Sequence, residues 1–345
     1  MRRPIRLALT MSAGLTLLGS AVAGTALAGT TPAAARPADA RQAILAAFDR
    51  YQVVGGMSPA HGVKDVDDFL LDLIRDPDLP GKVNDIAVEC GNSYYQPILD
   101  RYIAGDDVPA AEIQQVWRNT TQPNCGFSTF YEQLFPLVRR INEKLPPAKK
   151  LRVLACDPPV DWTKVHSQDD FLPFTERDTT IASVMEKQVL ARHRKALMLF
   201  GLAHTLHTSG AVAIYEQKYP NTTFVIADHL GFAKDNDVLE KRMAAWPTPS
   251  LTPVKGTWLD KLDSSYFSGF PGEWGSAAVD AYLYLGPRSL LIHQPLSAKA
   301  ILDEDYITEL DRRADTIGIP PNDPMRPAGI LQSESAASVL FYSPE

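Results

Sequence analysis

Motifs of several large enzyme classes are missing from this sequence of 345 residues. It contains no Gly-x-Ser-x-Gly elbow, the turn that presents the nucleophile of many serine hydrolases. It also lacks a Walker-type phosphate loop and the glycine fingerprint of dinucleotide-binding folds. A serine hydrolase of the elbow type is therefore disfavoured, and no motif points to a nucleotide cofactor.

Cysteine is scarce, with three residues at Cys90, Cys125 and Cys156, and no pair of them has zinc-finger spacing. An oxidising compartment would permit one disulfide, and the sequence leaves all three pairings open. Cys90 and Cys156 each end an apolar strand pattern, which is more typical of small buried hydrophobic residues than of nucleophiles.

Long apolar runs are lacking except at the N-terminus. Three arginines precede an apolar segment over 7–24, and Ala26 to Ala28 form a cleavage-type triplet. This pattern is typical of a secretory signal peptide over residues 1–28, with an uncleaved anchor as the alternative. No other stretch is long and apolar enough to span a bilayer. We therefore expect a secreted or periplasmic protein without an integral membrane span after cleavage.

A basic stripe is also lacking. The net charge of −7 becomes about −10 once the signal peptide is removed, because that segment carries three arginines and no acid. Nucleic acid and an anionic membrane surface are poor partners for such a chain.

What the sequence does contain is an alternation of strand and helix patterns. Residues 29–40 indicate a flexible leader, and 41–345 indicate a single large α/β domain with a mostly parallel central sheet and helices on both faces. The loop-rich segment 231–276 is expected to form a lid or pocket wall. The expected strands are 51–54, 85–88, 151–156, 196–200, 223–227 and 278–285. The expected helices include 41–48, 66–74, 95–103, 108–117, 127–145, 177–189 and 303–317.

Polar residues follow three of these apolar strands. His61 lies in the loop after the first strand, Glu89 ends the second, and His204 closes a Gly-x-x-His turn after the fourth. The carboxyl ends of parallel strands face one crevice, so these side chains are expected to share a space. A histidine there suits general-base chemistry, although a surface-loop histidine is the plain alternative.

Residues near these strand ends offer further candidates. A helix is expected immediately after Glu89, because Ser93 and Gln96 have capping-box spacing, and its free N–H groups would favour an anion. Asp65 is the expected cap of helix 66–74. Arg177 would supply a fixed cation, whereas Asp157 is a weaker candidate because Asp-Pro is also an ordinary turn.

At this point the chain resembles the superfamily that joins the erythromycin esterases, the ChaN-like haem-binding proteins and the TraB/Tiki proteins. The resemblance rests on the Gly-x-x-His motif at 201–204, the strand-ended Glu89, Arg177 at a helix start and the segment 279–286. One motif departs. Where the family has Gly-Glu-x-His, this chain has Ser58, Pro59, Ala60 and His61, so the motif glutamate is absent.

The resemblance implies three alternatives, and the sequence leaves them open. The first is a hydrolase in which His61 activates water against an ester, lactone or amide, with Glu89, His204 and Arg177 orienting or stabilising. A divalent metal bound by His61, Glu89 and His204 would assist in one version. The second is a protein that binds haem or another iron compound, with Tyr94, Tyr95 and His207 near the cofactor. The third is an inactive relative. Substrate and oligomeric state do not follow from the sequence.

Overall fold

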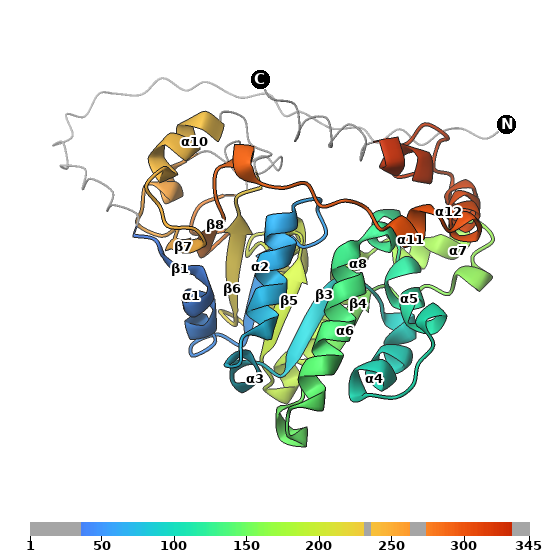
Figure 1. Cartoon of the computed structure of the whole chain (residues 1–345), viewed down its shortest axis with the longest axis horizontal. Coiled ribbons are helices and arrows are strands. Elements are labelled where there is room, and N and C mark those ends of the chain that lie inside the picture. The colour runs from blue at the N-terminus through green and yellow to red at the C-terminus, as the bar shows by residue number, and fades with distance from the viewer. Residues whose placement is uncertain (1–35, 231–235, 263–273, 333–345) are drawn as a thin grey trace, which may run out of the picture. The chain divides into compact units, whose positions relative to one another are not determined.

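The computed structural model describes residues 36–230, 236–262 and 274–332. The predicted signal peptide and most of the predicted leader lie outside these residues. Eight strands form one sheet in the order β1-β7-β8-β6-β2-β5-β3-β4 (Figure 1). The strands are β1 Ala38–Asp39, β2 Val53–Met57, β3 Asp85–Asn92, β4 Arg152–Asp157, β5 Ala196–Phe200, β6 Thr223–Asp228, β7 Ser250–Pro253 and β8 Ala281–Tyr284.

The sheet is mostly parallel. The six neighbouring strands from β8 to β4 all run in one direction, whereas β7 and β1 add an antiparallel edge. Parallel neighbours require crossover connections, and the helices between the strands provide them. The carboxyl ends of β2, β3, β4, β5 and β6 therefore meet at one edge of the sheet.

Helices cover both faces of the sheet (Figure 1). They are α1 Ala40–Ala47, α2 Lys64–Arg75, α3 Leu79–Lys82, α4 Gln96–Ala104, α5 Ala110–Arg118, α6 Thr129–Glu143, α7 Gln168–Phe171, α8 Arg177–Gln188, α9 Gly210–Glu216, α10 Asn236–Met243, α11 Ala298–Ile301 and α12 Glu304–Ile317. None of the helices in the described part of the chain is long and apolar enough to cross a membrane.

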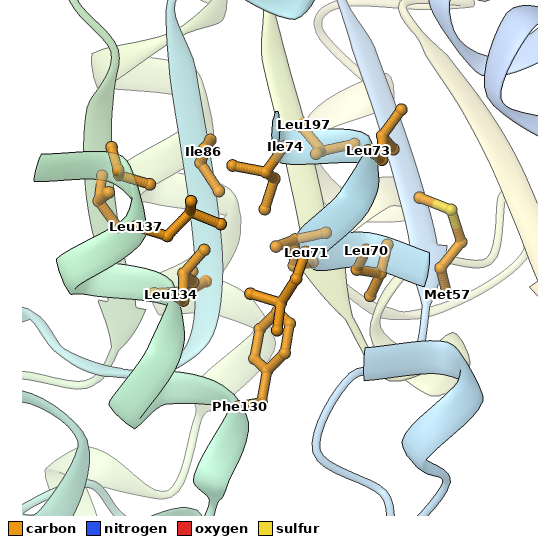
Figure 2. Close-up of a cluster of buried hydrophobic side chains, with 14 of the residues drawn as sticks. Met57, Leu70, Leu71, Leu73, Ile74, Ile86, Phe130, Leu134, Leu137 and Leu197 are labelled. Atoms are coloured by element: carbon orange, nitrogen blue, oxygen red, sulfur yellow. The ribbon is translucent and has the colours of Figure 1, made fainter. Parts of the chain in front are cut away.

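Strand β5 shows why helices flank both faces. All five of its residues are buried, and successive side chains point to opposite sides. Leu197 and Leu199 join a core with residues of α2 and α6, while Met198 and Phe200 join a second core with residues of α8 and α9. Figure 2 shows the first core, where the leucines of α2 and α6 pack against β3 and β5. Each fully buried leucine contributes roughly 2 kcal/mol.

These findings confirm the predicted fold class, a mostly parallel α/β sheet with helices on both faces. The ends of several elements differ from the prediction. Strand β3 continues to Asn92, so no helix begins directly after Glu89; a 3₁₀ turn, η1 Ser93–Tyr95, precedes α4. Asp65 lies in the first turn of α2 and does not cap it, since Val63 occupies that position.

Two predicted segments also contain more regular structure than expected. The end of the predicted leader forms β1, which pairs with β7. The segment 231–276 contains α10 and β7, and β7 pairs with β8 inside the sheet. The prediction that this loop-rich segment forms a lid or pocket wall stays a prediction, and 231–235 and 263–273 lie outside the described residues.

Candidate functional site

An arginine links two carboxylates at the carboxyl edge of the sheet. Arg177 is the first residue of α8, and its side chain is only 14% exposed. Its Nε donates to Oδ1 of Asp157 at 3.0 Å, and its Nη2 donates to Oε1 of Glu89 at 3.2 Å. A buried cation of this kind is tolerated because it is paired and hydrogen-bonded.

Asp157 is the last residue of β4 and is fully buried. It accepts from the backbone N–H and the hydroxyl of Thr121, at 2.6 and 2.8 Å, as well as from Arg177. Burial raises the pKa of Asp157, against the opposing charge of Arg177 and the bonds from Thr121. A carboxyl group that accepts three hydrogen bonds suits the ionised form, which anchors the guanidinium.

His204 lies in the 3₁₀ turn η7, Leu202–His204, directly after β5. Its Nδ1 is 2.6 Å from Oδ1 of Asp178, and its Nε2 is 3.4 Å from Oε1 of Glu89. Burial disfavours the charged ring, but the bonds to Asp178 and Glu89 outweigh it and raise the pKa of His204 to about 9. Nε2 has two contacts: Nη1 of Arg177 at 3.1 Å, which only donates and so needs Nε2 as an acceptor, and Oε1 of Glu89, which needs Nε2 to carry a proton.

Glu89 is the carboxylate that the surrounding cations share. Its Oε2 accepts the backbone N–H of Gly201 at 2.8 Å, while Oε1 faces Arg177 and His204. Burial alone would raise the pKa of Glu89. The hydrogen bond and charge of His204, with the charges of His61 and Arg177, instead hold this pKa well below its usual range. Glu89 is therefore an anion at working pH and does not act as a proton donor or acceptor.

His61 approaches the same group from the loop after β2. Its Nδ1 lies 2.8 Å from the carbonyl oxygen of Pro59. A carbonyl only accepts, so Nδ1 carries a proton, and in the neutral ring Nε2 is the nitrogen with the free lone pair. In the described part of the chain, Nε2 makes no hydrogen bond. The missing motif glutamate thus has a partial substitute in a backbone carbonyl, although the side chain of Pro59 has no polar atom.

Gly201 leaves space between His61 and Glu89. A Cβ atom at this glycine would lie 3.3 Å from Nε2 of His61 and 3.4 Å from Oε2 of Glu89. The backbone of Gly201 has φ −57° and ψ 145°, which any residue adopts. Glycine is therefore needed here for the space beside the two side chains and not for its backbone freedom.

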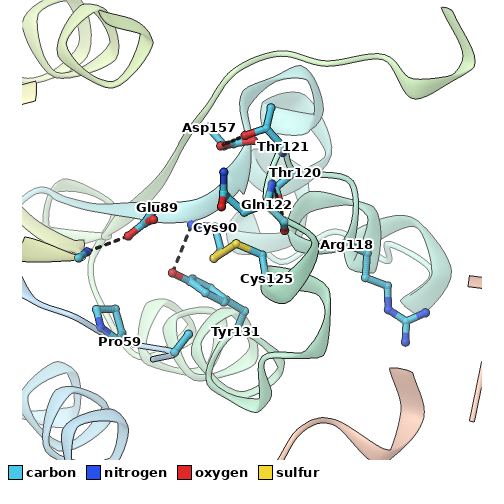
Figure 3. The surroundings of a disulfide bond; sticks show 12 residues. Pro59, Glu89, Cys90, Arg118, Thr120, Thr121, Gln122, Cys125, Tyr131 and Asp157 are labelled. Atoms are coloured by element: carbon cyan, nitrogen blue, oxygen red, sulfur yellow. Dashed lines mark hydrogen bonds between the residues drawn. A yellow bond between two sulfur atoms is a disulfide. The ribbon is translucent and has the colours of Figure 1, made fainter. Parts of the chain in front are cut away.

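A disulfide braces β3 next to Glu89 (Figure 3). Cys90 is bonded to Cys125, which selects one of the three pairings that the sequence left open. The backbone N–H of Cys90 donates to the hydroxyl oxygen of Tyr131 at 3.3 Å. Cys156 is free and buried, and burial raises the pKa of its thiol, so it is a packing residue as expected.

The three residues considered for haem make contacts of other kinds. His207 is held on both nitrogens, by Glu216 at 2.7 Å and by Asp280 at 2.9 Å. The hydroxyl of Tyr95 accepts from Asn119 at 3.0 Å, and Tyr94 is 47% exposed beside it. None of these contacts joins the group around Arg177.

The residues proposed as metal ligands do not fit a metal ion. No group of three or more His, Cys, Asp or Glu side chains in the described part of the chain is arranged to hold one. Both oxygens of Glu89 and both nitrogens of His204 already have partners, and the guanidinium of Arg177 supplies the positive charge between the carboxylates.

The structure thus brings together His61, Glu89 and His204, as the strand-end argument predicts. Arg177, the separate candidate for a fixed cation, lies with them. Sequence reasoning missed Asp178, whose place at a helix start is equally typical of a residue that satisfies the helix dipole. It also underrated Asp157. The position of Asp157 after an apolar run in the sequence, as for Glu89, was the available signal.

Comparisons with known proteins bear on the fold. No protein-family model and no curated protein matches the sequence. Among solved structures, a mutant erythromycin esterase in its open conformation aligns over 71% of this chain and 92% of its own, with 12% identity and a TM-score of 0.50. A succinoglycan biosynthesis protein aligns over 76% and 95%, with 10% identity and a TM-score of 0.51.

A haem-bound ChaN of Campylobacter jejuni aligns over 56% of this chain and 87% of its own, with 14% identity. Its TM-score of 0.36 is too low to support any inference. The first two alignments show that this chain shares its fold with an erythromycin esterase, as the resemblance in sequence motifs predicts, and with a succinoglycan biosynthesis protein. At these identities a common fold is all that they show.

Proposed function

We propose that this protein is a hydrolase in which His61 activates a water molecule for attack on an ester, lactone or amide carbonyl. The contact that carries the proposal is the one between Nδ1 of His61 and the carbonyl oxygen of Pro59, at 2.8 Å. It fixes the tautomer that leaves Nε2 as a base, beside the space that Gly201 leaves open. A positioned histidine of this kind contributes roughly 10²–10⁴-fold to such reactions.

The proposed reaction needs no group beyond the chain and water. The water oxygen forms a bond to the carbonyl carbon while its proton passes to Nε2 of His61. The ionised Glu89 stabilises the imidazolium that results, since the two charges interact. When the tetrahedral intermediate collapses, the bond to the leaving group breaks and that group takes the proton from His61.

Arg177 is the candidate for holding the developing oxyanion. The guanidinium has five N–H donors, of which the carboxylates of Asp157 and Glu89 take two. Its position is fixed before substrate arrives, so little reorganisation accompanies the reaction. His204 and Asp178 hold Glu89 and Arg177 in position. No step of the proposed reaction passes through a metal ion.

A panel of 4-nitrophenyl esters, lactones and aryl amides tests the proposal. Hydrolysis should fall about 100-fold or more in His61→Ala and remain unchanged in His166→Ala, which removes an exposed histidine elsewhere. Turnover that survives His61→Ala would contradict the assignment of the base. A folded wild-type protein that hydrolyses no substrate in the panel would favour the inactive relative.

We also infer that the protein acts outside the cytoplasm. The signal-peptide pattern over residues 1–28 supports export. The bond between Cys90 and Cys125 supports it independently, because disulfides persist in oxidising compartments. The intact mass of the protein recovered from the exporting cell tests this inference, and a mass that includes residues 1–28 in a cytoplasmic fraction would refute it.

A further inference from the structure

The loop that carries His61 adopts a backbone conformation that its residues do not favour. Met57 and Ala60 have φ of 66° and 63°, in the left-handed region that residues with a side chain rarely occupy. Such conformations persist only where neighbouring groups hold them. The contact between His61 and Pro59 lies within the loop and cannot by itself hold the loop against the rest of the molecule.

Two buried aspartates from other elements hold this loop. Asp67 lies in α2 and accepts the backbone N–H of Ala60 at 2.8 Å. Asp228 is the last residue of β6 and accepts the hydroxyl of Ser58 at 3.2 Å. The two bonds fix the loop on both sides of Pro59, whose carbonyl oxygen orients His61.

Each aspartate is more deeply buried than a charged group of this kind usually is. Asp67 is 1% exposed and Asp228 is 6% exposed. In each, Oδ1 makes the bond to the loop, while Oδ2 is buried without a hydrogen-bond partner in the described part of the structure. Burying a half-satisfied carboxyl is costly, and among the described residues no ion pair to either aspartate offsets the cost. A role in stability alone does not account for them.

From this geometry we infer that Asp67 and Asp228 are positioning residues for His61, which take over from the absent motif glutamate by fixing the loop 57–62. This inference rests on the proposed function of His61. The two residues act through the loop backbone and Ser58, and they do not touch the reacting atoms.

The electrostatics of the two carboxyls agree with such a role. Burial raises the pKa of Asp67 to about 7, against the bond from Ala60 and the charges of His61 and Lys64, with Asp68 adding to the rise. Burial also raises the pKa of Asp228 to about 6, against its hydrogen bonds and the charge of His61. Both carboxyls therefore interact electrostatically with the base that they position.

A double-mutant cycle with His61 tests the inference on activity. Asp67→Ala and Asp228→Ala should each lower kcat about 10- to 100-fold, with KM within about twofold, because a misplaced base slows the chemical step. In a His61→Ala background neither change should lower the remaining rate. Asp67→Asn and Asp228→Asn keep an acceptor oxygen and should restore kcat to within about threefold of the wild type.

Asp72→Asn on the same helix is the matched control, because Asp72 is 61% exposed and pairs only with Arg75 among the described residues. It should leave kcat unchanged. If the alanine variants lose the same factor with and without His61, the aspartates support folding only, and the inference is wrong. Thermal melting of each variant shows whether the protein compared is folded.

Imidazole ¹⁵N NMR supplies a readout that does not require a substrate. The neutral ring of His61 should carry its proton on Nδ1 in the wild type, and should shift towards the Nε2 tautomer in both alanine variants. Unchanged tautomers in both variants would overturn the inference even if the hydrolase proposal stands. If the alanine variants change the tautomer of His61 but the wild type hydrolyses no substrate, the proposed function is wrong and the positioning role stands.

Discussion

Gly201→Ala is the change that separates the chemistry of this site from its stability. The methyl group would stand 3.3 Å from Cε1 and Nε2 of His61 and 3.4 Å from Oε2 of Glu89. These contacts are tight but do not require a backbone shift. The substitution keeps the backbone N–H that donates to Glu89 at 2.8 Å. It narrows the space beside Nε2 of His61, where the proposed mechanism needs a water molecule.

The two expected effects have opposite signs. Alanine can adopt the backbone conformation of Gly201, and it restricts the unfolded chain more than the folded one. This effect stabilises the protein by about 0.5 kcal/mol. The tight contacts of the methyl group reduce that gain. Without a water molecule beside Nε2, His61 can no longer act as a general base. We expect kcat to fall about 100-fold, or about 2.7 kcal/mol in activation free energy.

The assay compares ester hydrolysis and urea unfolding in three proteins: the wild type, Gly201→Ala and Gly81→Ala. Gly81 is the matched control, because a Cβ there would meet nothing within 4 Å. Gly81→Ala should leave kcat unchanged. If Gly201→Ala keeps wild-type kcat and stability, the space between His61 and Glu89 does not hold the attacking water, and the mechanism proposed above is wrong.

Three further predictions concern stability. Glu89→Gln leaves Arg177 and His204 without their shared anion and should cost about 3 kcal/mol in urea unfolding; an unchanged midpoint would contradict the ion cluster. The pKa of His207 is about 9 when folded, because bonds to Asp280 and Glu216 outweigh the opposing effect of burial. The raised pKa of His207 contributes up to about 3 kcal/mol to the free energy of unfolding. This contribution is present below pH 6.5 and is lost as the pH rises through 9. In His207→Gln the free energy of unfolding should therefore fall less between pH 6.5 and 9 than in the wild type. If the two proteins lose the same free energy over this range, the assignment to His207 is wrong. Replacing Cys90 and Cys125 with serine should cost about 4 kcal/mol, because the bond closes a loop with a sequence separation of 35, whereas Cys156→Ala should leave that bond intact on a non-reducing gel.

Much of the fold was predictable because buried parallel strands are almost wholly apolar. Residues 196–200 could be assigned as a strand for this reason, and His204 after it as a strand-end residue. The end of β3 was not predictable. Asn92 continues the strand because its amide donates to the carbonyl oxygens of Asn119 and Val160, at 2.6 and 2.8 Å. Those partners are distant in sequence, so no local pattern announces them.

The site was predictable only in part, for a similar reason. Glu89 stood out because an apolar run ended on a charge. Asp67 did not, since it lies within an ordinary helix pattern, and its contact with Ala60 depends on the path of the loop. A side-chain motif also does not reveal that the carbonyl oxygen of Pro59 accepts a hydrogen bond from Nδ1 of His61. Contacts made by backbone atoms are invisible in a comparison of residue types.

The charges around Arg177 explain why a histidine fits at position 61. Glu89, Asp157 and Asp178 face one permanent cation, Arg177, and the ring of His204. At least one negative charge therefore remains unbalanced in this group. Among the described residues, Oε2 of Glu89, on the side of His61, has only a backbone N–H as its partner. An imidazolium at His61 would balance that charge. Proton transfer from water to His61 produces it, so the electrostatic field of the cluster favours the step that the proposed mechanism requires.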